Sequence, residues 1–227
     1  MEKEYYILKS GSPNAHTKNI YPQIFANWIP IEFDPLMQLE NKLGNKVPEN
    51  FLLRMDPKTR LTDFVSQSSI KAWGLLISPK AYEVISKFKI QSNHEVYEAK
   101  IEFKERIVDY FWLNPTKDYD SEINYEKTIF YKHYFLDEVT REFKALDGKD
   151  LVSQLLDDTN VGNVYCKEIF LYDKAVFEFD IFLIYFGVSA IVISKELLKA
   201  LVDAKLTGFE VHQDPIIFRY SAQDELN

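Results

Sequence analysis

The chain has 227 residues, 46% of them hydrophobic and 27% charged, with a formal net charge of −8. This balance is that of a folded protein and excludes an intrinsically disordered chain. It also argues against a nucleic-acid partner, because such proteins neutralise phosphates with a basic face, and no cluster of Lys and Arg supplies one.

The same acidic charge suits a basic protein partner, although it is also ordinary for a soluble protein. The single cysteine, Cys166, excludes an internal disulfide framework and a multi-cysteine metal site. The opening residues MEKEYYILKS lack the basic and apolar regions of a signal peptide, and the longest apolar run, at 181–193, is too short to cross a bilayer. We therefore expect a cytoplasmic protein without a membrane partner.

The first 47 residues alternate short apolar pieces with turn residues, and a strand is predicted at 5–9. A later strand, at 75–77, leads into Ser78 and Pro79. This pair predicts a helix start, because the serine oxygen caps free backbone amides and proline fits the first helical position. Apolar residues then recur at three- and four-residue spacing as far as Phe88, which is the pattern of one buried helix face.

Strands dominate the predicted middle of the chain. In residues 94–103 apolar and charged side chains alternate with the period of a half-buried strand, and residues 107–114 follow as a predicted hairpin partner. Extended segments are also predicted at 122–136 and 163–172, with a short helix at 148–158 between them. The sequence therefore indicates an α+β fold with a mixed, mostly antiparallel sheet and few helices.

A pattern from the first half of the chain returns in the second half. The segment GLLISPKAYEVI at 74–85 resembles AIVISKELLKAL at 190–201, since both pass from aliphatic residues through Ile-Ser into a helix-forming stretch. An aspartate precedes the serine at similar spacing in each case. Asp63 lies 15 residues before Ser78, and Asp180 lies 14 residues before the serine of the second segment.

Two interpretations of this repeat remain open. The first is a pair of pseudo-symmetric strand–helix–strand halves, at 48–113 and 163–220. The second is a similarity without common origin, because any buried strand that is followed by a capped helix shows this pattern. No linker rich in Pro, Gly or Ser separates the halves, so residues 1–227 are expected to form one unit.

Three blocks of the sequence resemble a known family. The first is LTDFV at 61–65 with GLLISPKAYEVI at 74–85, and the second is YFWLNPTKDYDSE at 110–122. The third is KEIFLYD at 167–173 with the segment 177–211, which contains the second Ile-Ser joint and Thr-Gly-Phe at 207–209. Across residues 48–213 they are similar to the immunity proteins of bacterial polymorphic toxin systems, in a family first catalogued as a domain of unknown function. The resemblance implies a protein that binds and neutralises a cognate toxin domain, without catalytic residues and without a cofactor.

An acidic turn is the predicted contact with that toxin. Its carboxylates attract a basic partner, and tyrosine is a frequent interface anchor. A calcium loop is not expected, because Ile123 stands where such a loop needs glycine and Ile129 stands where it needs glutamate. The candidate binding residues are Asp118, Tyr119, Asp120 and Glu122, with Asp157 and Asp158 as a second group.

Patterns of catalysis and metal binding are incomplete. The four histidines, at 16, 94, 133 and 212, lack zinc-ligand spacing, and Ser78 and Ser194 are expected to serve as helix caps. Ser68 and Lys71 match the nucleophile pair of some acyl enzymes, but the partner motifs of those enzymes are missing. We therefore expect no metal and no enzyme. The alternatives are a hydrolytic enzyme with a dispersed active site and an interaction module with another partner.

Overall fold

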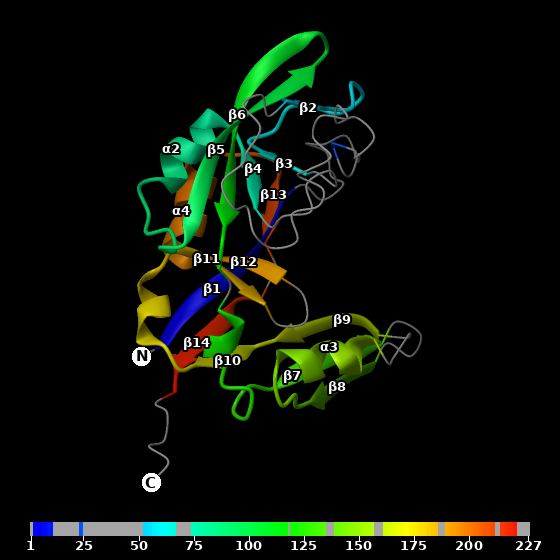
Figure 1. Ribbon diagram of the computed structural model, residues 1–227, viewed down its shortest axis with the longest axis vertical. Coiled ribbons are helices and arrows are strands. Elements are labelled where there is room, and N and C mark those ends of the chain that lie inside the picture. The colour runs from blue at the N-terminus through cyan, green and yellow to red at the C-terminus, as the bar shows by residue number, and fades with distance from the viewer. Residues whose placement is uncertain are drawn as a thin grey trace.

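The computed structural model describes residues 2–10, 23–24, 52–66, 74–117, 119–134, 139–156, 161–185, 189–211 and 214–221. Within these ranges there are three α-helices and fourteen strands (Figure 1). The strands form three sheets, in which most strand pairs are antiparallel. The predicted α+β fold class is confirmed. The helices are α2 (Pro79–Ile85), α3 (Gly148–Leu156) and α4 (Lys195–Asp203).

The first sheet has five strands in the order β2-β5-β6-β4-β3. β2 and β5 are parallel, and the other neighbours are antiparallel. β5 and β6 form a long hairpin whose two-residue turn, Lys104-Glu105, has positive φ at both positions, as a type I′ turn requires. The strands are β2 (Leu52–Arg54), β3 (Phe64–Val65), β4 (Leu75–Ile77), β5 (His94–Phe103) and β6 (Arg106–Pro115).

The second sheet repeats the order and the strand directions of the first. Its path is β10-β14-β1-β12-β11, with β13 beside β1, and only β10 and β14 are parallel. β1 comes from the start of the chain and takes the position that β6 takes in the first sheet. The strands are β1 (Glu2–Ser10), β10 (Glu168–Leu171), β11 (Ile181–Tyr185), β12 (Ser189–Ser194), β13 (Phe209–Val211) and β14 (Ile216–Tyr220).

A third, three-stranded sheet packs with α3 at the lower right of the molecule in Figure 1. Its order is β8-β7-β9, with strands β7 (Phe130–Tyr134), β8 (Val139–Phe143) and β9 (Val161–Cys166). Two segments that were each predicted to be one extended stretch are divided into separate elements in this region. The stretch 163–172 contains β9 and β10, which pair in different sheets, and 122–136 contains the end of the 3-10 helix η3 (Asp120–Glu122), a turn and β7.

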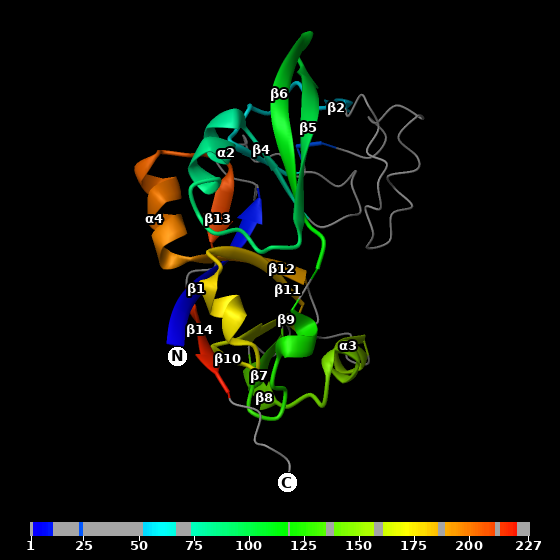
Figure 2. The ribbon, with the colours of Figure 1, turned by 60° about the vertical axis from the view of Figure 1, so that its left-hand side comes forward.

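The two large sheets share a hydrophobic core. α2 and α4 lie side by side in both views and contribute Ile85 and Leu201, which are fully buried (Figures 1 and 2). Ile77 at the end of β4 and Ile193 near the end of β12 belong to the same cluster. Each such aliphatic side chain stabilises the fold by about 1.5–3 kcal/mol relative to exposure, so this core joins the two halves.

Candidate functional site

The acidic turn predicted as the binding site follows β6. The backbone of Asp120 lies in η3, and Glu122 at its end is half-buried. Tyr119 is only 4% exposed, and its ring packs against Phe179 and Phe182 at centroid distances of 5.9 and 5.8 Å. Among the predicted binding residues, the structure describes the side chains of Tyr119 and Glu122, and of these two Glu122 reaches the surface. Three predicted residues lie outside the described residues: Asp118, Asp157 and Asp158.

Hydrogen bonds fix the segment that carries Glu122 against the edge of β10. The amide of Tyr172 donates to the Glu122 carbonyl at 2.8 Å, and the amide of Asn124 donates to the Phe170 carbonyl at 2.7 Å. The amide of Phe170 in turn donates to Thr128 Oγ1 at 3.2 Å. The segment from Glu122 to Thr128 is therefore anchored at both ends, to β10 and to Tyr172 directly after it.

The carboxylates of Glu122 and Asp173 both act on the phenol of Tyr119 at this turn. Burial raises the pKa of the Tyr119 phenol above its ordinary value, and a hydrogen bond with Ser92 acts in the opposite direction. The negative charges of Asp173 and Glu122 raise the pKa of Tyr119 further. Both carboxylates therefore lie within electrostatic range of the same phenol.

A pocket of about 170 Å³ opens beside this segment. Pockets for small-molecule ligands usually measure about 300–1,000 Å³, whereas a cavity of about 150 Å³ holds benzene. The pocket therefore has room for one side chain of a partner. Sequence reasoning missed it, because its residues come from two distant segments and form no motif. The lining residues are Lys127, Ile129, Tyr131, Lys167, Glu168 and Phe170.

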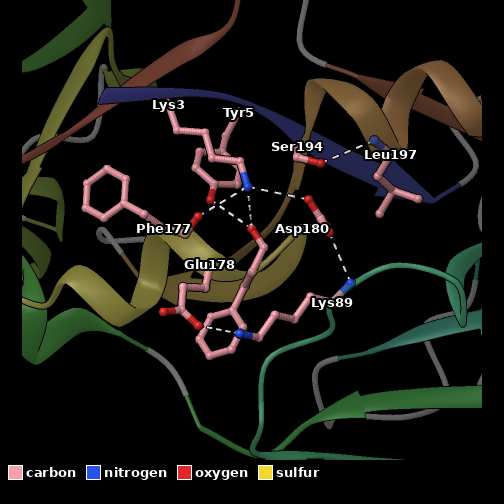
Figure 3. A network of polar contacts seen from close by, with 9 residues as sticks. Lys3, Tyr5, Lys89, Phe177, Glu178, Asp180, Ser194 and Leu197 are labelled. Atoms are coloured by element: carbon pink, nitrogen blue, oxygen red, sulfur yellow. Dashed lines mark hydrogen bonds and ion pairs between the residues drawn. The ribbon is translucent and has the colours of Figure 1, made fainter. Parts of the chain in front are cut away.

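A second polar feature surrounds Asp180 (Figure 3). Its carboxylate lies 3.4 Å from Lys3 Nζ of β1 and accepts a hydrogen bond from the amide of Lys89 at 3.0 Å. Lys3 Nζ also donates to the carbonyls of Phe177 and Phe179, and Tyr5 Oη donates to the Phe179 carbonyl at 2.8 Å. This network, which we name the Asp180 clasp, binds β1 and the chain after α2 to the start of β11.

The first half contains a matching network, which we name the Asp63 clasp. The Asp63 carboxylate accepts hydrogen bonds from Ser78 Oγ at 2.8 Å and from the amide and hydroxyl of Thr207 at 2.9 and 3.0 Å. Tyr110 Oη donates to the carbonyl of Thr62, the residue before Asp63, at 2.7 Å. Tyr5 bonds in the same way to the residue before Asp180, so Tyr110 and Tyr5 occupy equivalent positions.

The two clasps are reciprocal. Asp63, from the first half, binds Thr207 after α4, whereas Asp180, from the second half, binds Lys89 after α2. Backbone bonds repeat this exchange, since the amide of Phe64 donates to the Thr207 carbonyl and the amide of Asp180 donates to the Lys89 carbonyl. The equivalent aspartates seen in the sequence therefore each fasten the helix connection of the other half.

Ser78 and Ser194 are helix caps, as predicted. Ser78 Oγ accepts from the amide of Ala81 at 3.1 Å, and Ser194 Oγ accepts from the amide of Leu197 at 3.2 Å. Ser194 is fully buried. Each hydroxyl therefore satisfies one of the free amides at the start of its helix.

Among the described residues, no three His, Cys, Asp or Glu side chains converge in a way that could hold a metal ion. None of the helices in the same ranges is long and apolar enough to span a bilayer. No protein-family model matches the chain, and no curated protein matches its sequence.

The equivalent tyrosines allow a pH test of the clasps. Burial, together with the charge of Asp180 for Tyr5 and of Asp63 for Tyr110, raises the pKa of both phenols above the ordinary value. Their contribution to stability is therefore complete below the unfolded value of about pH 10 and is lost as the pH rises further. We expect these two phenolates to appear only with alkaline unfolding, as a cooperative step in absorbance at 295 nm. Smooth ionisation of all 14 tyrosines with unchanged circular dichroism would contradict this assignment.

Proposed function

We propose that the protein is an immunity protein that binds and neutralises a cognate toxin domain. The resemblance of three sequence blocks to the immunity proteins of polymorphic toxin systems supports this class of partner. The observation that carries the proposal is the ordered acidic segment beside a pocket of side-chain size. We name this surface the Glu122 face and define it by Glu122, Asp173, Lys127, Ile129 and Phe170.

The Glu122 face has the properties of a binding surface. Because hydrogen bonds already order its backbone, association costs less conformational entropy than it does for a mobile loop. A basic group of the toxin meets Glu122 and Asp173, and the net charge of −8 increases the rate of encounter. An apolar toxin side chain fills the pocket against Ile129 and Phe170, as buried anchors do at interfaces.

The pocket rim carries both positive and negative side chains. A toxin surface that complements the rim is therefore expected to be mixed in charge as well. Lys167 is exposed, and its ammonium group lies 5.3 Å from the centre of the Tyr131 ring. Glu168, on the same rim, pairs with Arg219 at 3.2 Å. We therefore infer a toxin surface that is basic beside Glu122 and polar or acidic beside Lys167. Among the described residues, no observation specifically favours a hydrolytic enzyme.

Reversing the charge of Glu122 tests the proposed face. The substitution Glu122→Lys is expected to weaken toxin binding tenfold or more, which corresponds to about 1.4 kcal/mol, because it repels the basic group that Glu122 attracts. The candidate toxin domain is the C-terminal domain of any large secreted protein that is found encoded beside this gene. Affinity is measured by calorimetry, together with protection of cells that produce the domain.

The matched control is Glu83→Lys, which makes the same change of charge at a 75% exposed side chain on α2. This control is expected to bind the toxin like the wild type. If Glu122→Lys also binds like the wild type, the Glu122 face is not the contact. If the wild-type protein neither binds the domain nor protects the cells, the proposed function itself is wrong.

A further inference from the structure

Part of the hairpin of β5 and β6 has an outer edge that no described strand covers. β4 pairs with β6 only at residues 111–113, and within the described residues no strand pairs with the outer side of β6 at 106–110. Figures 1 and 2 both show the hairpin extending past β4 and α2 at the top of the molecule, at the opposite end from β10. This part of β6 is therefore a sheet edge at the opposite end of the molecule from β10, the strand beside which Glu122 lies.

The register shows which backbone groups point outward. A two-residue turn joins the hairpin's closing pair, Phe103 and Arg106, so this pair exchanges its hydrogen bonds across the hairpin. Backbone groups alternate along a strand, so the N–H and C=O groups of Ile107 and Asp109 face the open side. Phe111, the next residue in this series, pairs with β4. A further strand beside 107–109 would therefore continue the ladder that β4 begins.

The side chains on this edge are exposed. Ile107 is 63% exposed, although it is a large apolar residue. Asp109 is also exposed, and no hydrogen bond or ion pair joins its carboxylate to another described residue. Unpaired edges of this kind accept strands from other chains unless charges, prolines or a covering element protect them.

The second sheet shows how the equivalent edge looks when it is protected. Because Tyr5 corresponds to Tyr110, the residues of β1 that correspond to Ile107 and Asp109 are Glu2 and Glu4. Glu4 pairs with Lys195 at the start of α4 at 3.0 Å, and Glu2 pairs with Arg219. The same edge position therefore carries paired charges in the second sheet and an exposed isoleucine in the first.

We propose that residues 106–109 bind an extended segment of a partner protein as an added antiparallel strand. The direction continues that of β4, and the cross-strand neighbours define the chemistry of the segment. A basic residue faces Asp109, an apolar residue faces Ile107 and an acidic residue faces Arg106. In its own chain direction the segment reads basic, any residue, apolar, acidic. This site is separate from the Glu122 face and does not depend on the proposed toxin.

A second copy of this chain fits the edge poorly. A two-fold axis through Val108 places each Ile107 opposite the carboxylate of the other copy's Asp109. An axis through Ile107 instead places the Asp109 of each copy opposite the Glu105 of the other copy, which makes two pairs of like charges. One register puts a charge against an apolar side chain and the other pairs like charges, which destabilises both arrangements. The charges of the edge therefore favour a different chain.

A synthetic peptide tests the proposal on the full-length protein. The peptide has eight residues and blocked ends, with lysine, threonine, isoleucine and glutamate opposite positions 109, 108, 107 and 106. Saturating peptide is expected to slow hydrogen exchange of the Ile107 and Asp109 amides tenfold or more. A control peptide is N-methylated at the two residues opposite these positions, where the missing N–H donors prevent pairing. It is expected to give no protection.

A variant of the protein adds a second control. Ile107→Lys alters an exposed side chain and is expected to weaken peptide binding about tenfold, whereas Val202→Lys, at a 58% exposed position on α4, is expected to leave binding unchanged. Equal protection by the methylated peptide, or no protection at millimolar peptide, overturns the proposal. Protection that appears without peptide and grows with protein concentration also overturns it, since the edge then pairs with a second copy.

Discussion

Replacing Gly208 with alanine is expected to lower the free energy of unfolding by about 3 kcal/mol or more. Gly208 has a φ of +83°, a left-handed value that costs other residues about 1–2 kcal/mol. An added Cβ also lies 2.1 Å from the Phe64 carbonyl oxygen and 2.5 Å from Thr62 Cβ, so the backbone has to move. The clash falls where the Asp63 clasp binds Thr207, and it therefore disturbs the junction between the halves.

Urea unfolding followed by circular dichroism measures this loss. The control is Lys87→Ala in the turn after α2, whose side chain is 65% exposed and whose replacement is expected to change stability by less than about 0.5 kcal/mol. If Gly208→Ala is as stable as this control, the left-handed backbone at position 208 is not required by the fold.

Replacing Asp63 with alanine is expected to lower the free energy of unfolding by about 2–4 kcal/mol. The carboxylate accepts three hydrogen bonds, and bonds to a charged group are each worth about 1.5–3 kcal/mol. The total stays below their sum because Asp63 is half-buried and the bonds are not independent. The loss leaves the amide of Thr207 without its acceptor, which adds a desolvation cost.

A double-mutant cycle with Thr207→Val separates the clasp from general effects of the substitution. We expect a coupling free energy of about 1 kcal/mol or more between the two positions, measured by urea unfolding. Asp109→Ala is the matched control, because Asp109 is exposed and has no bonded partner among the described residues. Equal stability of the Asp63 and Asp109 variants would show that the clasp does not stabilise the fold.

The features that the sequence predicted are local ones. A serine that caps a helix contacts an amide three residues away, so the short motif at Ser78 contains the whole interaction. The hairpin at 94–115 follows from alternation, since the side chains of a strand point to opposite faces in turn. The spacing of Asp63 and Asp180 likewise revealed equivalent positions. It did not reveal that each aspartate binds the chain of the other half.

The features that the sequence did not predict depend on distant partners. Nothing in residues 2–10 indicates that they complete a sheet whose other strands begin at residue 168. Tyr119 stands in an acidic turn and looks exposed locally, but Phe179 and Phe182 bury its ring from sixty residues away. The pocket beside Glu122 has the same origin, because segments 127–131 and 167–170 meet only in the folded protein.

Complex formation with the toxin domain tests the central claim most directly. The full-length protein is mixed with the candidate toxin domain, which is the C-terminal domain of any large secreted protein that is encoded beside its gene, and the dissociation constant is measured by calorimetry. We predict a stable complex with a dissociation constant below about 1 μM, or about −8.2 kcal/mol, and loss of the domain's toxicity within that complex. A domain that stays fully toxic, with no binding at a hundredfold higher concentration, would contradict the account.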